Sequence, residues 1–149
     1  MRLGSRLTGA MKKGKLMAKT KSKPKSKTAS KRKRKSVTVA GLKRAVEGRK
    51  ADSLAAMYSD DAVMHVIDRD NPPSKPRKLE GKQQISAYHA DVCGRDMTHR
   101  IENGVATGNR LAFTQSCAYP DGAKVFCSAM IELKGGKIAR QTVVQAWDG

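Results

Sequence analysis

The imidazoles of His99 and His65 are the side chains of this sequence best suited to proton transfer. Imidazole titrates near neutral pH, so either histidine could act as a general base. The hydroxyls of Tyr88, Tyr58 and Tyr119 could donate a hydrogen bond to an oxyanion that develops during a reaction. Tyr88 is the best placed, because it lies on the apolar face of a predicted helix. Alternatively, each histidine is a surface or hydrogen-bonded core residue, and each tyrosine is a core ring with a hydrated hydroxyl.

Three cysteines, Cys93, Cys117 and Cys127, form an odd set without a Cys-x-x-Cys motif. They predict reduced thiols and a cytoplasmic location rather than a disulfide framework. A cysteine nucleophile needs a base beside it. A position near His99 is conceivable for Cys117 or Cys127, but no sequence pattern supports it. The pattern His-x-x-Asp-x-Asp at residues 65–70 has no second histidine, so we expect no metal site, and no motif indicates a cofactor.

Positive charge is concentrated at the start of the chain. Residues 1–36 hold fifteen Lys and Arg and no acid, whereas the other 113 residues hold sixteen bases and thirteen acids. Low apolar content and charge repulsion predict a disordered arm, similar in composition to lysine-rich linker-histone-like tails. Such an arm could tether the protein to nucleic acid or another polyanion by counterion release, or it could only increase solubility. Its densest basic cluster is Lys31, Arg32, Lys33, Arg34 and Lys35.

Residues 37–149 are long enough for one domain with its own hydrophobic core, and no apolar run approaches the ~20 residues of a membrane span. Apolar spacings of three and four predict short helices around Leu42 and Leu54, the second with Tyr58 on its apolar face, and a third around Tyr88. Helices first and an antiparallel meander afterwards indicate an α+β fold, with helices against one face of a curved sheet. The predicted strands are 62–67, 77–79, 97–106, 110–119, 124–133 and 138–147.

The register of two predicted strands can be inferred from their turn. Pro120-Asp121-Gly122 is a strong turn signal and predicts a three-residue loop after Tyr119. We choose the register that groups apolar side chains on one face, since a one-residue slip would break that grouping. It makes Cys117 and Cys127 cross-strand neighbours in the core. The expected pairs are Cys117 with Cys127, Phe113 with Ile131, and Leu111 with Leu133.

Five segments together resemble the SnoaL-like members of the nuclear transport factor 2-like superfamily in their order and spacing. They are Tyr58–Val63, Leu79–Ile85, Leu111–Thr114, Gly136–Ile138 and Gln145–Asp148. The resemblance implies a cone-shaped, strongly curved mixed sheet wrapped around three N-terminal helices, with a pocket at its wide end and dimerisation through the sheet. The superfamily includes ketosteroid isomerase, polyketide cyclases, epoxide hydrolases, dehydratases and non-catalytic binding or scaffolding domains, so the fold leaves the function open.

The resemblance also implies which residues face the pocket. Dehydratase-like members use a histidine on the first long strand, which makes His99 the leading general base, with Tyr88 as oxyanion donor. The carboxylates of isomerase-type members would fall beside Val66 and near Ala129, where neither acid is present. On the last strand Gln145 and Trp147 would line the pocket together with Gln141 and Val143; a two-residue Gly-Gly turn would instead place Arg140 and Thr142 there. The expected pocket residues are Tyr58, His65, Phe113, Cys117, Cys127, Gln145 and Trp147.

Three functions remain open at this point. The first is a domain that binds a small apolar or amphipathic molecule, with the basic arm as a polyanion tether. The second is an enzyme of the isomerase, cyclase or dehydratase type that uses His99. The third is a catalytically inert, dimeric scaffold. A pocket filled by side chains would exclude the enzyme, and a His99 that points away from the pocket would exclude this mechanism.

Overall fold

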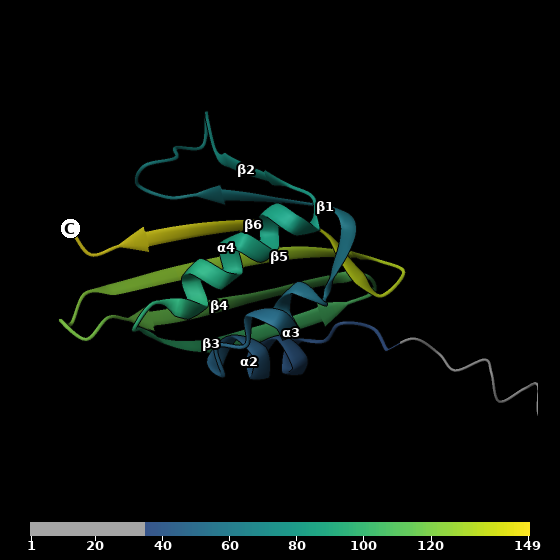
Figure 1. The fold of residues 1–149 in the computed structure, drawn as a ribbon, viewed down its shortest axis with the longest axis horizontal. Helices are drawn as coiled ribbons and strands as arrows, with labels where there is room; N and C mark the ends of the chain where they lie inside the picture. The colour runs from purple at the N-terminus through teal and green to yellow at the C-terminus, as the bar shows by residue number, and fades with distance from the viewer. Residues whose placement is uncertain (1–34) are drawn as a thin grey trace, which may run out of the picture. The chain divides into compact units, whose positions relative to one another are not determined.

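The computed structural model describes residues 35–149, whose six strands form one sheet that packs against three helices (Figure 1). This confirms the α+β class expected from the sequence. The helices are α2 (Val39–Glu47), α3 (Ala51–Ala55) and α4 (Lys82–Gly94). The strands are β1 (Tyr58–Ile67), β2 (Arg77–Glu80), β3 (Thr98–Thr107), β4 (Arg110–Ala118), β5 (Lys124–Lys134) and β6 (Lys137–Trp147).

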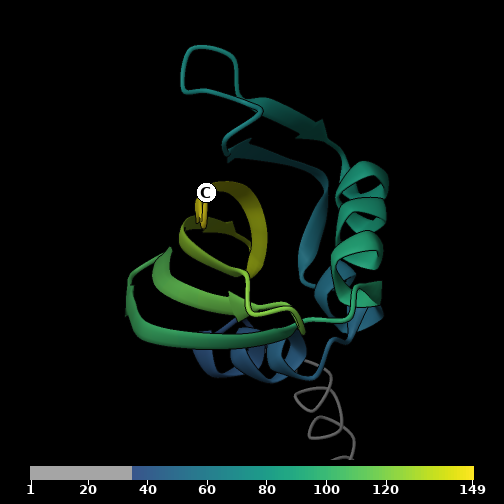
Figure 2. The same ribbon diagram turned by 90° about the vertical axis from the view of Figure 1, so that its left-hand side faces the viewer.

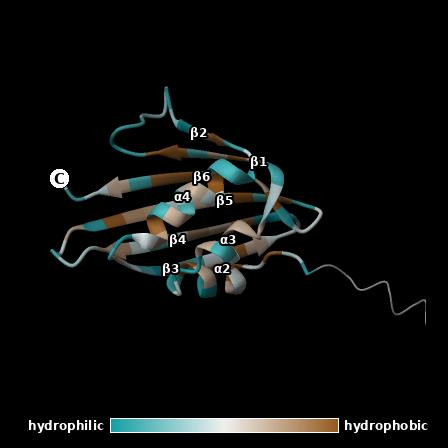
Figure 3. Ribbon diagram, in the orientation of Figure 1, coloured by the Kyte–Doolittle hydropathy of each residue, from teal (hydrophilic) through white to brown (hydrophobic). Residues whose placement is uncertain are grey.

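The strand order across the sheet is β2-β1-β6-β5-β4-β3. The last strand, β6, inserts between β1 and β5 and runs parallel to β1, whereas all other neighbours are antiparallel. The sheet is strongly curved, with α4 beside β1 and α2 beside β3 (Figure 2). The strongest hydrophobic colour lies on the strands (Figure 3), and their inward side chains make up most of the core.

Most of the predicted basic arm lies outside the described residues, including Lys31, Arg32, Lys33 and Arg34. Lys35 is the first residue that the structure describes, and it is exposed. Residues Lys35–Gly149 form one compact unit. Within this part of the chain, no helix combines the length and the apolar character needed to cross a bilayer.

β1 begins earlier than the strand predicted at residues 62–67. Tyr58, expected on the apolar face of the second helix, is instead the first residue of β1 and pairs with Ile138 of β6. The Ile138 N–H donates to the carbonyl of Met57 at 2.8 Å, a usual hydrogen-bond length. The local apolar spacing was therefore overridden by long-range pairing with the last strand.

The β4–β5 register differs from the expected one by two residues. The predicted three-residue loop is present, since the Tyr119 N–H donates to the Ala123 carbonyl at 2.9 Å. The expected pairs were nevertheless wrong. Because side chains alternate with period two, a two-residue error keeps every side chain on its predicted face, and Cys117 and Cys127 become diagonal neighbours with free thiols. The observed pairs are Cys117 with Val125, Phe113 with Ala129, and Leu111 with Ile131.

The free edge of β3 is covered by side chains of α2. The Ile101 N–H donates to Glu47 Oε2 at 2.9 Å, and Lys43 Nζ donates to the Ile101 carbonyl at 3.0 Å. Both backbone groups lie on the edge strand, where no neighbouring strand can pair with them. Nearby, β3 passes so close to α2 that a Cβ on Gly104 would overlap the side chain of Val39. These contacts fix the strand that carries His99.

Candidate functional site

A cavity of about 300 Å³ lies between α4 and the inward-facing side chains of the sheet. Most of its wall comes from α4 and from strands β3 to β6, and the loop that follows β1 closes one side. Single side chains of α2, α3, β1 and β2 complete the wall. Small-molecule sites in proteins usually have volumes of 300–1,000 Å³, so this cavity is at the small end of that range. Apolar side chains of Met97, Phe113, Val125 and Val143 alternate around it with groups that can form hydrogen bonds.

Most of the residues expected at the pocket line this cavity. On β6 the side chains of Gln141, Val143, Gln145 and Trp147 face it, while Arg140 and Thr142 lie on the outer side of the sheet. The other expected residues along the wall are Tyr88, His99, Phe113, Cys117 and Cys127.

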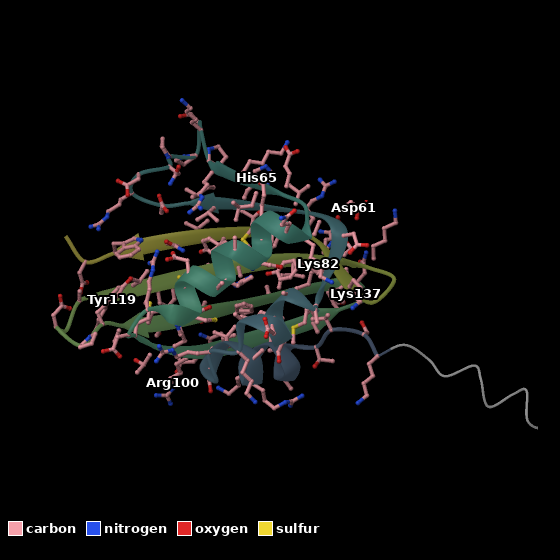
Figure 4. All side chains as sticks on the ribbon, viewed as in Figure 1. Asp61, His65, Lys82, Arg100, Tyr119 and Lys137 are labelled. Carbon is pink, nitrogen blue, oxygen red and sulfur yellow. The ribbon has the colours of Figure 1, made fainter. Side chains whose placement is uncertain are left out.

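Two expected residues do not line the cavity. His65 is on β1 (Figure 4), but the inward positions on that strand belong to Met64 and Val66, so strand alternation turns the imidazole to the outer face. Tyr58 is fully buried behind the cavity wall. Its hydroxyl bonds to two residues that do line the cavity, donating to Gln141 Oε1 and lying 2.9 Å from His89 Nε2. Tyr58 therefore positions the wall.

His89 is a cavity residue that the sequence reasoning missed. The signal was present, because His89 completes the helical pattern of Ile85, Tyr88 and Val92 at position i+4. Burial lowers the pKa of His89 from 6.5 to about 4, so the ring is neutral at neutral pH. Because Tyr58 uses its one O–H to donate to Gln141, His89 Nε2 carries the ring proton and donates to the Tyr58 oxygen.

His99 and Cys117 lie directly opposite each other on β3 and β4. His99 Nδ1 is 3.2 Å from Cys117 Sγ, and Gln115 Nε2 lies 3.1 Å from the same nitrogen and 3.2 Å from the same sulfur. His99 is only 8% exposed. Its other ring nitrogen, Nε2, is the one buried side-chain nitrogen or oxygen of residues 35–149 without a hydrogen-bond partner. The structure thus places a base, His99, beside the Cys117 thiol, a proximity that no sequence pattern indicated.

The pKa values of the two cavity thiols, Cys117 and Cys127, are shifted in opposite directions. Hydrogen bonds from Cys127, His99 and Gln115 lower the pKa of Cys117, although burial acts against them. The pKa of Cys127 is raised, because its thiol donates to Cys117 and is itself buried. Of the two sulfurs, Cys117 is therefore the one that loses its proton first.

Tyr88 and Trp147 form a polar and aromatic end of the cavity. Gln145 connects them, since its Nε2 donates to the Tyr88 hydroxyl and its Oε1 accepts from Trp147 Nε1, both at 3.1 Å. Burial raises the pKa of Tyr88 to about 12, so its hydroxyl stays protonated. Arginine guanidinium groups lie over both rings, Arg77 at 5.5 Å from the Tyr88 centroid and Arg69 at 4.7 Å from the Trp147 centroid.

Carboxylates are scarce in the cavity wall. The positions implied for isomerase-type acids hold Val66, which is buried, and Ala129, which lines the cavity. Asp68 lines it too, but its Oδ1 accepts hydrogen bonds from the backbone of Asp70 and Asn71 and from the Asn71 side chain, at 2.8–2.9 Å. Asp68 therefore stabilises the loop. Across residues 35–149, no three His, Cys, Asp or Glu side chains group in a way that could hold a metal ion.

Comparison with known proteins identifies the family to which this domain belongs. The sequence model of the SnoaL-like domain matches residues 39–141, which is more than half of the chain. The chain therefore belongs to the SnoaL-like domain family. No curated protein matches the chain.

Solved structures from several bacteria share the fold at low sequence identity. A provisionally named ketosteroid isomerase from Kribbella flavida DSM 17836 has a TM-score of 0.61 and 15% identity, over 74% of each chain. An NTF-2-like protein of unknown function from Burkholderia xenovorans LB400 has a TM-score of 0.60 and 18% identity, over 74% of this chain and 79% of that one. A similar protein from Mesorhizobium loti has a TM-score of 0.59, 14% identity and coverages of 72% and 85%. At these identities the likeness shows the fold alone.

Proposed function

We propose that the SnoaL-like domain, residues 37–149, binds a small amphipathic molecule in the cavity. The observation that carries the proposal is that His99 lines the cavity while its buried Nε2 has no hydrogen-bond partner among residues 35–149. A buried polar atom without a partner costs about 1–3 kcal/mol, and a ligand that bonds to it recovers much of that cost. Apolar neighbours such as Phe113 and Val143 would bury the carbon skeleton of the same ligand.

A second candidate function is proton transfer, with His99 as general base and Tyr88 as oxyanion donor. Both residues line the same cavity. The Tyr88 oxygen accepts a hydrogen bond from Gln145, which leaves its own O–H available to a ligand carbonyl. The corresponding reaction class is proton abstraction beside a carbonyl, as an isomerase, cyclase or dehydratase would perform. The third candidate is a scaffold whose cavity has no ligand.

The test is a thermal-shift screen with steroids, polyketides and fatty acids, applied to the wild type, His99→Ala and His65→Ala. We expect ligands that raise the melting temperature of the wild type and of His65→Ala, whose imidazole faces outward. In His99→Ala their affinity should fall about fivefold or more, because one hydrogen bond of about 1 kcal/mol is lost. Equal affinities in all three proteins, or no stabilising ligand, would contradict the proposal. Turnover that depends on His99 would favour the enzyme.

We also propose that the basic arm, residues 1–36, tethers the domain to nucleic acid. The support is the positive charge of the arm, which holds fifteen Lys and Arg and no acid, whereas basic and acidic residues nearly balance in the rest of the chain. Deleting residues 1–36 should abolish binding to duplex DNA at low salt and leave the melting temperature unchanged. For the full chain, log affinity should fall with log salt concentration at about −0.9 per neutralised phosphate. Fluorescence anisotropy of labelled duplex DNA measures the loss of binding and its salt dependence, and thermal denaturation measures the melting temperature. DNA binding that survives the deletion would place the contact on the domain instead.

A homodimer through the outer face of the sheet is the third part of the proposal. This face, on the side opposite the cavity, carries exposed apolar side chains, and we define it by Val105, Phe126, Met130 and Val144, which are 46–62% exposed. Arg110 and Arg140 pair with Glu132 beside them, at 3.2 and 3.7 Å. An apolar patch with a polar surround is typical of a protein–protein interface.

A further inference from the structure

We propose that Cys117 is a nucleophile activated by His99, and that the cavity takes a small α,β-unsaturated carbonyl compound to which Cys117 adds covalently. The inference rests on the proposed ligand cavity and gives it a substrate class. The two positions where isomerase-type members carry carboxylates hold Val66 and Ala129 here, so the proposed chemistry depends on Cys117 and His99.

The first support is the geometry of the thiol. Cys117 Sγ lies 3.2 Å from His99 Nδ1, within reach for proton transfer from sulfur to imidazole. Gln115 Nε2 lies 3.2 Å from the same sulfur and can donate to it, which stabilises negative charge there. Both Cys117 and His99 line the cavity.

The second support is the unpartnered Nε2 of His99. His99 lines the cavity, its Nε2 is buried, and no group of the described residues bonds to that nitrogen. A neutral ring that can take a proton from Cys117 on Nδ1 already carries a proton on Nε2, and after the transfer the imidazolium Nε2–H is a stronger donor that needs an acceptor. A ligand carbonyl or enolate oxygen is such an acceptor, so the proton transfer and the ligand support each other.

The surroundings of the sulfur also favour a thiolate. Cys127 from β5 donates to Cys117, which together with His99 and Gln115 lowers the pKa of the Cys117 thiol. The other titratable or charged groups along the cavity wall are Tyr88 and His89 from α4, Cys93 and Arg95 at its end, Tyr119 after β4, Arg77 from β2, and Asp68, Arg69 and Asp70 from the loop after β1. The two carboxylates in this set lie in the loop, and one of them is bonded within it.

The reaction needs no further reactant. Cys117 gives its proton to His99 Nδ1, and the sulfur lone pair forms a C–S bond with the β-carbon of the unsaturated carbonyl. The C=C π electrons move to the α-carbon and oxygen as an enolate, whose oxygen the Tyr88 hydroxyl can stabilise. The imidazolium then delivers one proton to the α-carbon and returns to neutral imidazole. The product is a thioether with a saturated carbonyl, and no oxidant, reductant or leaving group is involved.

The experiment treats the full chain with 2-cyclohexen-1-one at pH 7 and measures the rate at each cysteine by peptide mapping. Cys117 should react about tenfold faster than Cys93, although Cys93 is the more accessible of the two, because the thiolate is the reactive form. His99→Asn should slow Cys117 by about tenfold, and His65→Asn should leave the rate unchanged. An excess of cyclohexanone, the saturated counterpart, should protect Cys117 by occupying the cavity.

The pH profile of the wild type keeps the proposal testable even if His99→Asn does not fold. The rate at Cys117 should persist to a lower pH than the rate at Cys93, whose pKa burial raises. Slower reaction at Cys117 than at Cys93 at every pH, or an unchanged rate in folded His99→Asn, would overturn the inference. If screened ligands bind but Cys117 stays unreactive, the inference fails and the binding function stands. Fast reaction without protection by cyclohexanone would instead contradict the binding cavity.

Discussion

Between pH 7 and pH 5 the free energy of unfolding is expected to fall by about 2 kcal/mol because of His89 alone. Burial lowers the pKa of His89 from 6.5 to about 4 in the folded protein. Below pH 6.5 the unfolded chain binds a proton that the folded protein excludes, so acid favours unfolding. The contribution of His89 is complete above pH 6.5 and lost as the pH falls toward 4. At about 1.4 kcal/mol per pKa unit, the whole loss amounts to roughly 3 kcal/mol.

Urea denaturation of the wild type, His89→Gln and His65→Gln over pH 5–7 measures this effect. His89→Gln should make the pH dependence less steep, whereas His65→Gln, on the outer face, should leave it unchanged. The Cys117 thiol, whose pKa is also lowered in the folded protein, adds a loss of stability toward acid that all three proteins share. This window excludes the carboxylates of Glu47 and Glu80, whose lowered pKa values cost stability only below about pH 4.5. An equally steep pH dependence in His89→Gln would show that the imidazole is not held neutral.

Lysines at Met130 and Val144 are expected to separate the proposed dimer into monomers. Both side chains are exposed on the outer face, at 59% and 46%, so the substitutions should leave the monomer folded. In a two-fold interface each lysine occurs twice, which places four unpaired charges in the contact. Burying an unpaired charge costs several kcal/mol, so the dimer dissociation constant should rise at least about 100-fold.

Light scattering after size-exclusion chromatography over a range of concentrations gives the mass of each protein. Ala87→Lys/Ala90→Lys is the matched control, because it adds the same two charges at exposed sites on α4, away from this face. The control and the wild type should remain dimers at concentrations where Met130→Lys/Val144→Lys is a monomer. A monomeric wild type at every concentration, or a double variant that stays dimeric, would contradict the proposed interface.

The sequence alone determined the class of the fold and much of the cavity wall. Alternation along β4 and β5 placed Phe113, Cys117 and Cys127 inward even though the predicted pairing was wrong by two residues. This robustness arises because a strand repeats every two residues, so an even error in register preserves the face. Helical spacing likewise placed Tyr88 on the inner face of α4 and contained the signal for His89.

Only the tertiary structure decided which way β6 and β3 face. A two-residue Gly135-Gly136 turn does form, and Lys134 pairs with Lys137. By alternation this turn would bring Arg140 inward, but a one-residue shift before Arg140 restores Gln141 to the cavity. A strand irregularity of this kind inserts one residue and reverses the faces beyond it, and no periodic pattern in the sequence marks its position.

The same device places His99 beside Cys117. From the turn, Thr107 pairs with Arg110, and an unbroken ladder would set His99 opposite Ala118 on the outer face. Instead the register shifts by one between Glu102 and Val105, where Asn103 has a φ of 53°. Sequence periodicity could identify an imidazole and a thiol on neighbouring strands. The bulge in β3 turns the His99 side chain toward Cys117. Its position is fixed where β3 packs against α2, by contacts between residues far apart in the chain, so sequence periodicity could not predict it.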